Sequence, residues 1–408
     1  MTTAMQAPST ASPDAAVNSL GLAKPPSETR VVVAMSGGVD SSVTAALLHE
    51  QGYDVVGITL QLYDHGVAIQ AKGACCAGAD IHDARTVAGR LGIPHYVLDY
   101  ESRFADQVMQ DFADSYLRGE TPIPCVRCNQ TVKFTDLLTT ARELGADCLA
   151  TGHYVRRVAG PDGAELHRGA DAAKDQSYFL FATTPDQLDY LRFPLGGMNK
   201  DETRELAYLY GLAVADKPDS QDICFVPNGR YSDVVRRLRP GAVEAGEIVH
   251  MDGTVLGRHD GVIDFTIGQR RGIGIGGRKG ADETEGPLYV VAIDAAEHRV
   301  IVGPHSALAC HEVRLSDTSW VAREGAPGVG TPILARLRNT APALPATLVS
   351  VEGAHVLLRL DEPQFGISAG QAAVLYASDN ADRVLGGGWI VEAPSAALSR
   401  NLSSEAIG

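Results

Sequence analysis

Along residues 30–154, short apolar runs alternate with amphipathic segments, and this alternation constrains the fold more than any other feature of the sequence. Continuous apolar runs of this length are typical of strands buried on both faces of a sheet. Such strands are predicted at Val31–Met35, Val55–Leu60, Tyr96–Leu98 and Leu149–Thr151. Helices are predicted from Val43 up to Gly52, from Asp80 to Leu91, at Phe104–Leu117 and at Phe134–Leu144. Because strands that alternate with helices form right-handed βαβ units, we predict an α/β domain with a doubly wound parallel sheet.

The pattern changes beyond this region. Lys174–Gly211 is predicted to extend the helical part, and within it Lys200–Tyr210 follows Asn199 as an N-cap. From about Gly241 onward, short strands alternate with turn signals such as Asp252-Gly253, which is typical of all-β structure. The predicted domains are an α/β domain at 28–240, a small β-rich central domain at 241–307 and an all-β barrel at 308–395, with a disordered tail at 1–27 and a second tail at 396–408.

Charge and cysteine content argue against several classes of protein. The 408 residues carry 35 basic and 50 acidic side chains, a net charge of −15, so bulk charge alone does not hold a nucleic acid. No apolar run approaches the ~18 residues of a membrane span, and no charged segment precedes an apolar one, so we expect a cytoplasmic protein without membrane contact or signal peptide. Seven cysteines do not make a disulfide framework. The Cys125-Val126-Arg127-Cys128 segment and the Cys75-Cys76 pair indicate chemistry or metal binding instead.

The segment Ser36-Gly37-Gly38-Val39-Asp40-Ser41 separates the first predicted strand from the first helix. Its glycines allow the backbone to turn tightly and to approach a ligand, while amide hydrogens and the helix dipole favour an anion. It is not a Walker A loop, because no Gly-Lys-[Ser/Thr] follows. A plain turn with a serine cap is the simpler interpretation, but two glycines with flanking serines favour phosphate binding. The Gly152-His153 turn lies at another strand end, where doubly wound sheets bind their ligands.

This loop resembles the Ser-Gly-Gly-x-Asp-Ser signature of the PP-loop ATP pyrophosphatase superfamily, whose members cleave ATP between the α and β phosphates and leave an adenylated substrate. Other segments resemble the tRNA-specific 2-thiouridylases, in the right order and over about Arg30 to Trp389. They are Gly119–Gln130 with Lys133-Phe134, Ala150–Tyr154, Lys174–Tyr178, Ser220–Phe225 and Thr266–Gly272. The resemblance implies 2-thiolation of the wobble uridine, position 34, of tRNA with ATP and Mg²⁺. It also implies a sulfur donor such as a cysteine desulfurase or a sulfur-relay protein.

Sulfur transfer of this kind has clear chemical requirements. A carbonyl oxygen becomes a leaving group when it is adenylated, and sulfur then arrives as a nucleophile, usually from a protein persulfide that a second cysteine attacks. By resemblance, Cys128 is the nucleophile and Cys224 carries the persulfide. A buried structural thiol is the alternative interpretation of Cys224. Cys148 and Cys310 are interpreted as core residues, and the Cys75-Cys76 pair is assigned no role.

The resemblance also implies two sets of binding residues. The ATP contacts are Ala34, Met35, Ser36, Gly37, Gly38, Val39, Asp40, Ser41, Leu60 and Gly152. The tRNA contacts are Ile123, Pro124, Cys125, His153, Lys174, Asp175, Gln176, Arg338, Asn339 and Gln371. A basic, glycine-bearing segment that carries Arg270, Arg271, Arg278 and Lys279 is either a solvated loop or, as the resemblance favours, a contact to the tRNA backbone.

Cys125 departs from the family pattern, because the matching position is often not cysteine. Its spacing to Cys128 supplies only two of the four ligands of a closed zinc site, so no zinc is expected. Cys125, Cys128 and Cys224 could instead ligate three irons of a [4Fe–4S] cluster, with one iron open for sulfur. Two other functions stay open: a PP-loop amidotransferase or ligase, which would not need two loop cysteines, and a non-catalytic tRNA-binding protein, against which the intact phosphate loop argues.

Overall fold

The computed structural model describes residues 17–63, 76–219, 223–226, 230–275 and 286–393. At its N-terminal end is a five-stranded sheet in the order β3-β2-β1-β4-β7, in which every pair of neighbours is parallel. Its strands are β1 (Arg30–Ala34), β2 (Asp54–Gln61), β3 (His95–Asp99), β4 (Cys148–Ala150) and β7 (Leu191–Arg192). Strand β1 lies at the centre and is apolar because both of its faces are buried.

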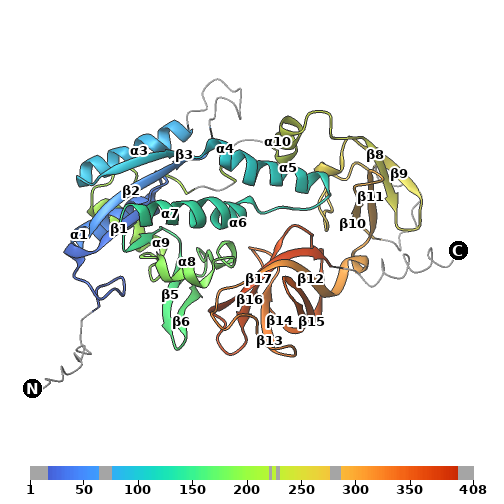
Figure 1. The fold of residues 1–408 in the computed structure, drawn as a ribbon. Helices are drawn as coiled ribbons and strands as arrows, with labels where there is room; N and C mark the ends of the chain where they lie inside the picture. The colour runs from blue at the N-terminus through green and yellow to red at the C-terminus, as the bar shows by residue number, and fades with distance from the viewer. Residues whose placement is uncertain (1–16, 64–75, 220–222, 227–229, 276–285, 394–408) are drawn as a thin grey trace, which may run out of the picture.

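Helices cover both faces of this sheet (Figure 1). Val31 and Val33 of β1 pack in one core with α1 (Val39–Glu50), α3 (Cys76–Leu91) and α9 (Lys200–Leu209). Val32 points the other way and packs in a second core with α6 (Pro124–Cys128), α7 (Leu137–Glu143) and α8 (Pro185–Tyr190). The predicted doubly wound parallel sheet is therefore confirmed.

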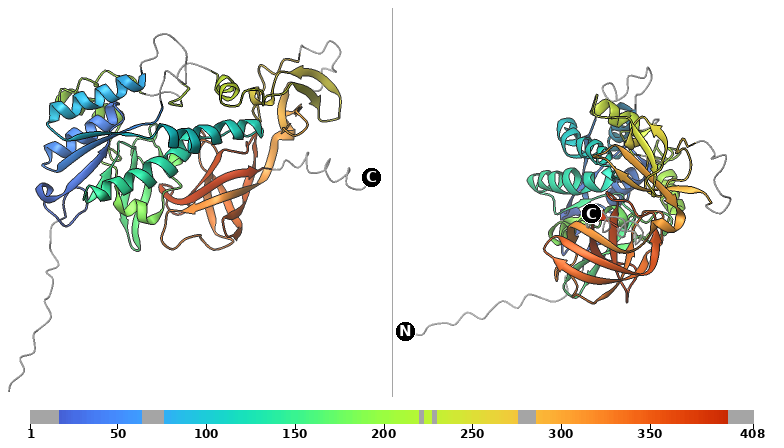
Figure 2. Two further views of the ribbon diagram at one scale, coloured as in Figure 1. Left: turned by 45° about the horizontal axis from the view of Figure 1, so that its top comes forward. Right: turned by 90° about the vertical axis from the view of Figure 1, so that its right-hand side faces the viewer.

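Two long helical segments run from the sheet toward the β-rich parts of the molecule (Figures 1 and 2). The first joins α4 (Glu101–Phe104), the π-helical η2 (Ala105–Met109) and α5 (Gln110–Leu117). The second joins α6, the π-helical η3 (Asn129–Asp136) and α7. The segment that carries Cys125 and Cys128 was expected to be a loop that precedes a helix at Phe134. It is instead the first turn of that helix, which Pro124 begins as a favourable N-terminal residue.

The predicted helical extension over Lys174–Gly211 is only partly right. It contains the short 3₁₀ helix η4 (Ser177–Phe179), helix α8, strand β7 and helix α9. Pro194 and the Gly196-Gly197 pair interrupt the helical period. Helix α9 begins where predicted, because Asn199 and Glu202 cap it reciprocally at 2.9 and 2.7 Å. Helix α10 (Tyr231–Leu238) was not predicted.

The middle of the chain forms a four-stranded sheet in the order β10-β11-β8-β9. Its strands are β8 (Gly246–His250), β9 (Val255–His259), β10 (Leu288–Asp294) and β11 (Arg299–Pro304). The hairpin β8–β9 turns at Gly253, whose φ of 90° suits glycine. Val290 and Val300 pack against Phe112 of α5, so this sheet shares a core with the helical segment.

The C-terminal strands form a closed antiparallel barrel, since the first strand pairs with both β15 and β17. They are β12 (Ala309–Trp320), β13 (Pro332–Arg336), β14 (Leu344–Glu352), β15 (His355–Phe365), β16 (Ala372–Ala377) and β17 (Arg383–Glu392). Figures 1 and 2 show the barrel beneath the long helices and the central sheet at their far end. The predicted fold class, with a small β-rich part before an all-β barrel, is confirmed.

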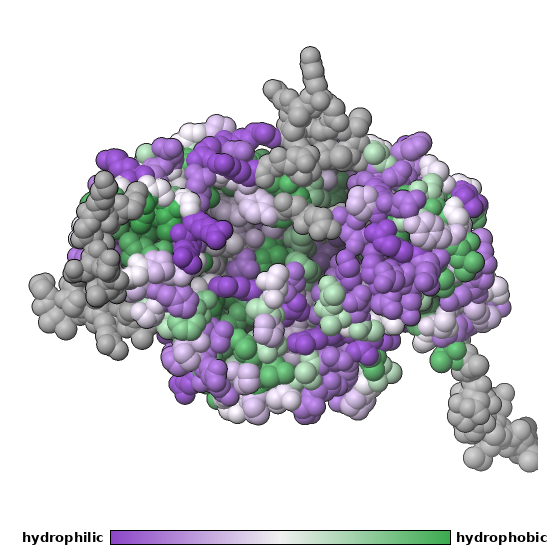
Figure 3. Space-filling view, turned by 180° about the vertical axis from the view of Figure 1, so that it is seen from behind, coloured by the Kyte–Doolittle hydropathy of each residue, from purple (hydrophilic) through white to green (hydrophobic). Residues whose placement is uncertain are grey.

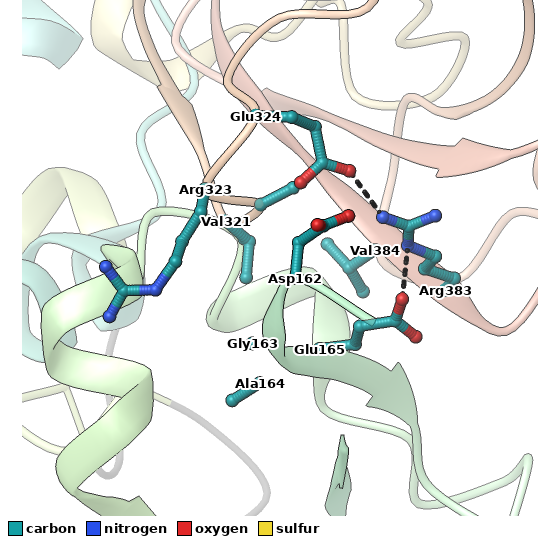
Figure 4. Close-up of a pocket in the computed structure, with 10 residues that line it drawn as sticks. Asp162, Gly163, Ala164, Glu165, Val321, Arg323, Glu324, Arg383 and Val384 are labelled. Atoms are coloured by element: carbon teal, nitrogen blue, oxygen red, sulfur yellow. Dashed lines mark hydrogen bonds and ion pairs between the residues drawn. The ribbon is translucent and has the colours of Figure 1, made fainter. Parts of the chain in front are cut away.

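A hairpin of the α/β domain extends the barrel sheet, which the sequence did not predict. It consists of β5 (Val155–Gly160) and β6 (Gly163–Arg168), and Leu166 of β6 pairs with Val384 of β17. Figure 4 shows the contact, where Arg383 forms ion pairs with Glu165 at 3.2 Å and with Glu324 at 2.6 Å. The cavity there has a volume of about 10 Å³, room for one water molecule. This junction is structural, because it has no room for a ligand.

Candidate active site

The sheet order places a topological switch point at β1. The chain leaves β1 through α1 toward β2 on one side, whereas β4 lies on the other side. In such sheets a crevice opens between the carboxyl ends of the diverging strands. The Ser36–Ser41 segment follows β1, and Gly152 follows β4. A Cβ atom on Gly152 would lie 2.9 Å from the carbonyl carbon of Asp40 and 2.9 Å from the amide nitrogen of Ser41, so the two predicted ATP segments are in direct contact.

The phosphate loop, residues 36–41, is held in a tight conformation. Gly37 has a φ of 76°, and a Cβ atom there would overlap the carbonyl oxygen of Asp80. The backbone amide of Ser36 donates to Oγ of Ser41 at 3.1 Å. Gly38 is the N-cap of α1 and has no side chain, so it leaves the first amides of the helix for a ligand. This cradle fits the phosphates of ATP. Of the other predicted ATP residues, Met35 and Val39 pack in the core with α1 and α3, whereas Ala34 and Leu60 pack against the core on the other face of the sheet.

Lysines and carboxylates surround the loop. The Nζ atom of Lys200, which is buried, lies 2.7 Å from Oδ1 of Asp40 and 2.8 Å from Oδ1 of Asp219. Asp219 also accepts from Lys174 at 2.7 Å. Burial alone would raise the pKa of Asp219, but the hydrogen bonds from Lys174 and Lys200 lower it to about 2. Tyr154 donates to Asp40 at 2.8 Å, so Asp40 is fixed by two donors.

Another lysine, Lys217, contacts the backbone of the loop. The Nζ atom of Lys217 donates to the carbonyl oxygen of Gly37 at 3.0 Å and to Asp80 and Asp83 at 2.7 and 2.6 Å. Lys217 therefore joins the loop to the first turns of α3. The two ammonium groups of Lys200 and Lys217 flank the loop and can stabilise a departing polyanion.

The three cysteines predicted to take part in sulfur chemistry, Cys125, Cys128 and Cys224, form no disulfide bond. Cys128 is buried in the core that includes Phe225, whereas Cys125 and Cys224 are exposed to solvent. Burial raises the pKa of Cys128, and the positive charge of Lys133 opposes this effect. The protein around Cys224 raises its pKa to about 12, with Cys128 and Cys125 adding to the effect. The three thiols are therefore electrostatically coupled.

Cys224 is exposed, which argues against its interpretation as a buried structural thiol. Cys148 and Cys310 are buried in β4 and β12, in agreement with the core interpretation. Cys75 lies outside the described residues. In the part of the chain that the structure describes, no group of three or more His, Cys, Asp or Glu side chains is arranged to hold a metal ion. The positions of Cys125, Cys128 and Cys224 in this structure therefore do not fit the ligand set of a [4Fe–4S] cluster.

His153 connects the loop to the thiols. It follows Gly152, and its ring lies 6.0 Å from the ring of Phe134 in an edge-on contact. Oγ1 of Thr151 lies 2.9 Å from Nδ1 of His153. Burial, aided by the charge of Lys133, lowers the pKa of His153 to about 3. The same ammonium group therefore acts on the pKa values of His153, Cys128 and Cys224. The contact with Phe134 joins His153 to the helical segment that follows Cys128.

The chain is similar to known protein families along most of its length. The model described as "tRNA methyl transferase HUP domain" matches residues 29–228, "tRNA methyl transferase PRC-barrel domain" matches 234–304 and "Aminomethyltransferase beta-barrel domain" matches 310–390. The "tRNA-specific 2-thiouridylase MnmA" of Rhodospirillum centenum is 66% identical over 92% of this chain and 95% of its own. That of Maricaulis maris is 64% identical over 91% of this chain and 89% of its own. The chain belongs to the tRNA-specific 2-thiouridylase family.

Solved structures give only a distant likeness to this thiouridylase. A 4-thiouridine synthetase in complex with RNA and ATP has a TM-score of 0.32 and 15% identity, over 52% of this chain and 51% of its own. An NMN synthetase from Francisella tularensis has a TM-score of 0.30 and 18% identity, over 52% of this chain and 77% of its own. No helix among the described residues of the thiouridylase is long and apolar enough to cross a membrane.

The tRNA residues predicted for the α/β domain of this thiouridylase occupy varied environments. Ile123 and Pro124 begin the helix that carries Cys125, and Pro124 is buried. Lys174 is half-exposed beside Asp219. The carboxylate of Asp175, in contrast, is only 4% exposed and pairs with Arg336 of the barrel at 2.8 Å. Oε1 of Gln176 accepts from the amide of Tyr154 at 2.9 Å. Asp175 and Gln176 are thus positioned to hold the barrel and the His153 turn in place.

One of the three residues predicted in the barrel contacts the segment that precedes α6. Arg338 donates to the carbonyl oxygens of Phe365 and Gly366. Nε2 of Gln371 donates to the carbonyl oxygen of Thr121 at 2.7 Å, three residues before the start of α6. Asn339 is exposed next to Arg338. The barrel of the thiouridylase therefore contacts the segment that leads into its thiols.

The basic segment predicted as a tRNA backbone contact is described only in part. Arg270 and Arg271 are exposed. Arg278 and Lys279 lie outside the described residues. The face opposite that of Figure 1 is hollowed near its centre and bordered mainly by hydrophilic side chains (Figure 3).

Sequence reasoning missed several residues of this site. Lys200, Lys217 and Tyr154 contact the loop or its carboxylate, yet no sequence pattern assigned them a role. Tyr154 lies within a segment that carries the family resemblance, and Asp219 directly precedes another such segment. The resemblance is the only signal that could have indicated these two residues. Lys200 is more than 150 residues from Asp40 along the chain, so only the fold shows their contact.

Proposed function

We propose that this protein thiolates C2 of the wobble uridine, position 34, of tRNA at the expense of ATP. The carrying observation is the continuity of the site, from the phosphate loop through Gly152 and His153 to the thiols of Cys128 and Cys224. An ATP-dependent ligase needs the first half of this site only. A sulfurtransferase needs both halves, because sulfur must reach the carbon that ATP activates.

The first step is adenylation of the uridine. O2 of the base attacks the α phosphorus of ATP, an O–P bond forms, and the bond to the β phosphate breaks. The amides of Gly37 and Gly38 and the ammonium groups of Lys200 and Lys217 would hold the departing pyrophosphate. Mg²⁺, which enters with ATP, supplies further neutralisation of the phosphate charge.

The second step is sulfur transfer. A donor, such as a cysteine desulfurase or a sulfur-relay protein, places a sulfur atom on Cys224 as a persulfide, and its exposed side chain gives the donor access. Cys128 attacks the inner sulfur of the persulfide, so the S–S bond breaks and sulfide is released as a Cys128–Cys224 disulfide forms. Sulfide attacks C2, and AMP leaves with the former O2. The two thiols provide the two electrons that reduce the sulfur, and an external thiol reductant restores them.

Both thiols are in their protonated form at neutral pH. Burial raises the pKa of Cys128, and protein atoms that displace water around the thiol of Cys224 bring its pKa to about 12, although the residue as a whole is exposed. Nucleophilic attack needs the thiolate. Lys133 is the cation that opposes the effect of burial on both groups, so it would stabilise the thiolate as it forms.

The test is thiolation of tRNA with ATP, Mg²⁺ and a persulfide donor, followed by nucleoside mass spectrometry. We expect wild type to form 2-thiouridine at position 34, and Cys128→Ser or Cys224→Ser to form none. Cys310→Ser, a buried thiol of the barrel, is the matched control and should retain activity. Cys125→Ser should also retain most activity in the persulfide mechanism. An iron-bearing wild type whose Cys125→Ser variant loses iron and activity together would favour the cluster mechanism instead.

Nitrogen transfer is the remaining alternative. A wild-type enzyme that releases AMP and pyrophosphate in the presence of tRNA and an amine, but never forms 2-thiouridine, would support an amidotransferase or ligase. The gathering of Cys125, Cys128 and Cys224 in one site argues against that outcome.

A further inference from the structure

We propose that Cys125 is a resolving cysteine, which takes over the disulfide that sulfur transfer leaves between Cys128 and Cys224 and brings it to the protein surface. The proposal rests on the proposed function, because that disulfide forms only when Cys128 has released sulfide from the persulfide of Cys224. The persulfide mechanism itself needs no third thiol. Cys125 would act after it, in the step that returns the enzyme to its starting state.

Cys125 and Cys128 lie one turn apart on the same helix. Both belong to α6, where they occupy helical positions i and i+3. Residues with this spacing share a helix face and have Cα atoms about 5 Å apart, and disulfides join Cα atoms that are ~4.4–6.8 Å apart. The charge of Cys125 also contributes to the raised pKa of Cys128. The two sulfur atoms can therefore bond with only a small adjustment of that turn.

Contacts on several sides hold this turn of α6 in place. The guanidinium group of Arg127 lies 4.6 Å from the centre of the Trp389 ring of the barrel. It also forms an ion pair with Asp111 of α5 at 3.5 Å. Val126 is completely buried in the core on the α6 side of the sheet. Because both cysteines belong to one fixed turn, the attack of Cys125 on the sulfur of Cys128 is an intramolecular reaction with a high effective concentration.

Access from solvent differs among the three sulfur atoms. Cys128 is only 6% exposed, and protein atoms displace water around the thiol of Cys224. Cys125, in contrast, is exposed. In thiol–disulfide exchange the attacking thiolate must reach the sulfur atom itself, so a reductant in solution has poor access to a disulfide between Cys128 and Cys224. A disulfide between Cys125 and Cys128 has one of its sulfur atoms on an exposed residue.

The exchange that moves the disulfide is balanced in atoms and electrons. The thiolate of Cys125 attacks the sulfur of Cys128, so a Cys125–Cys128 bond forms and the Cys128–Cys224 bond breaks. Cys224 leaves as a thiolate and takes up the proton that Cys125 lost, so it can accept the next sulfur atom. The protein gains or loses no electrons in this step. A protein dithiol then attacks the sulfur of Cys125 and supplies the two electrons that restore both thiols.

Disulfide mapping after a single turnover tests the assignment. Wild type, Cys125→Ser and Cys310→Ser are loaded with persulfide sulfur, freed of the donor and mixed with ATP, Mg²⁺ and tRNA without reductant. Acid quenching, alkylation and peptide mass spectrometry then locate the disulfides. We expect wild type to contain a Cys125–Cys128 disulfide and a free Cys224 thiol, in proportion to the 2-thiouridine formed. Cys125→Ser should contain a Cys128–Cys224 disulfide instead. Cys310→Ser lacks a buried thiol of the barrel and, as the matched control, should give the wild-type result.

The steady-state rate provides a second readout. With a low concentration of thioredoxin as the only reductant, Cys125→Ser should form 2-thiouridine at least about tenfold more slowly than wild type, because its disulfide has no intramolecular route to the surface. An excess of dithiothreitol should restore most of the lost rate, since a small thiol can enter where a protein cannot. A loss of rate that dithiothreitol leaves unchanged would overturn the resolving role and indicate that Cys125 acts on the tRNA.

The outcomes separate this proposal from the proposed function. A Cys128–Cys224 disulfide in wild type that has formed 2-thiouridine would overturn the resolving role and leave the proposed function intact, as would a disulfide from Cys125 to Cys75 or Cys76. If no sample forms 2-thiouridine, the proposed function fails. The cysteine pair is then judged by equilibrating free wild type and Cys224→Ser with oxidised and reduced dithiothreitol. A Cys125–Cys128 disulfide in both proteins would support a redox-active pair, and its absence would refute one.

Discussion

Replacing Gly152 with alanine tests how closely the end of β4 must approach the phosphate loop. The added Cβ atom would lie 2.9 Å from two backbone atoms, the carbonyl carbon of Asp40 and the amide nitrogen of Ser41. Ordinary contact with a methyl group begins near 3.4 Å, so the loop or the turn must move by about 0.5 Å. Overpacking of this kind costs about 1–3 kcal/mol, which corresponds to about 2–12 °C in Tm for a domain of this size.

The catalytic effect of Gly152→Ala should exceed its effect on stability. A misplacement of about 1 Å costs roughly 100-fold in rate, so a shift of half that size should lower the rate of pyrophosphate release about 10-fold. The assay is tRNA-dependent pyrophosphate release over a range of ATP concentrations, with the unfolding curve of the same sample. Gly197→Ala is the matched control, because Gly197 has an ordinary φ and no atom within 4 Å of its added Cβ. If Gly152→Ala keeps kcat and the KM for ATP within twofold of wild type, the assignment of this crevice to ATP is wrong.

Three further outcomes are expected. Because the pKa of Cys224 is about 12, its rate of alkylation should rise about tenfold per pH unit from pH 7 to 10. Peptide mass spectrometry measures this rate, and a plateau below pH 9 would contradict the expectation. His153 has a pKa of about 3, so it takes up no proton as the pH falls from 8 to 5. The NMR chemical shifts of its imidazole nitrogens should therefore stay constant over this range. A titration midpoint above pH 5 would refute the burial of the ring. Lys200→Met leaves Asp40 and Asp219 without their shared cation and should lower the free energy of unfolding by about 3 kcal/mol, as measured by urea denaturation. Lys24→Met removes an exposed ion pair and should change the free energy of unfolding by less than about 1 kcal/mol.

The parts of the fold that were predictable from sequence are those with a local cause. Strands β1 and β2 are buried on both faces, so their apolar runs are continuous and their positions were predicted within one or two residues. Helix α9 was located by its capping residue, Asn199. The phosphate loop was identified because its glycines meet local steric requirements, which the overlap of a Cβ at Gly37 with Asp80 demonstrates.

The parts that escaped prediction have causes far away in the chain. The hairpin β5–β6 contains Arg156, Arg157 and Glu165 and shows no regular alternation, since β17 supplies the pairing that stabilises it. The buried Lys200 is explained only by two carboxylates from other elements. Cys128 and Cys224 lie far apart in the chain, so the sequence supported their roles only through family resemblance.

The pairing of β6 with β17 has a consequence for how the protein is made. Roughly 200 residues separate the two strands, so at ~5–20 residues per second a ribosome needs about 10–40 s between completing one and completing the other. During that interval the nascent hairpin presents an edge strand with unsatisfied backbone groups. A truncated chain that ends before Arg383 would keep this edge permanently, and we expect such fragments to associate with one another even though their α/β sheet is complete. The last strand of the barrel thus protects a segment translated long before it.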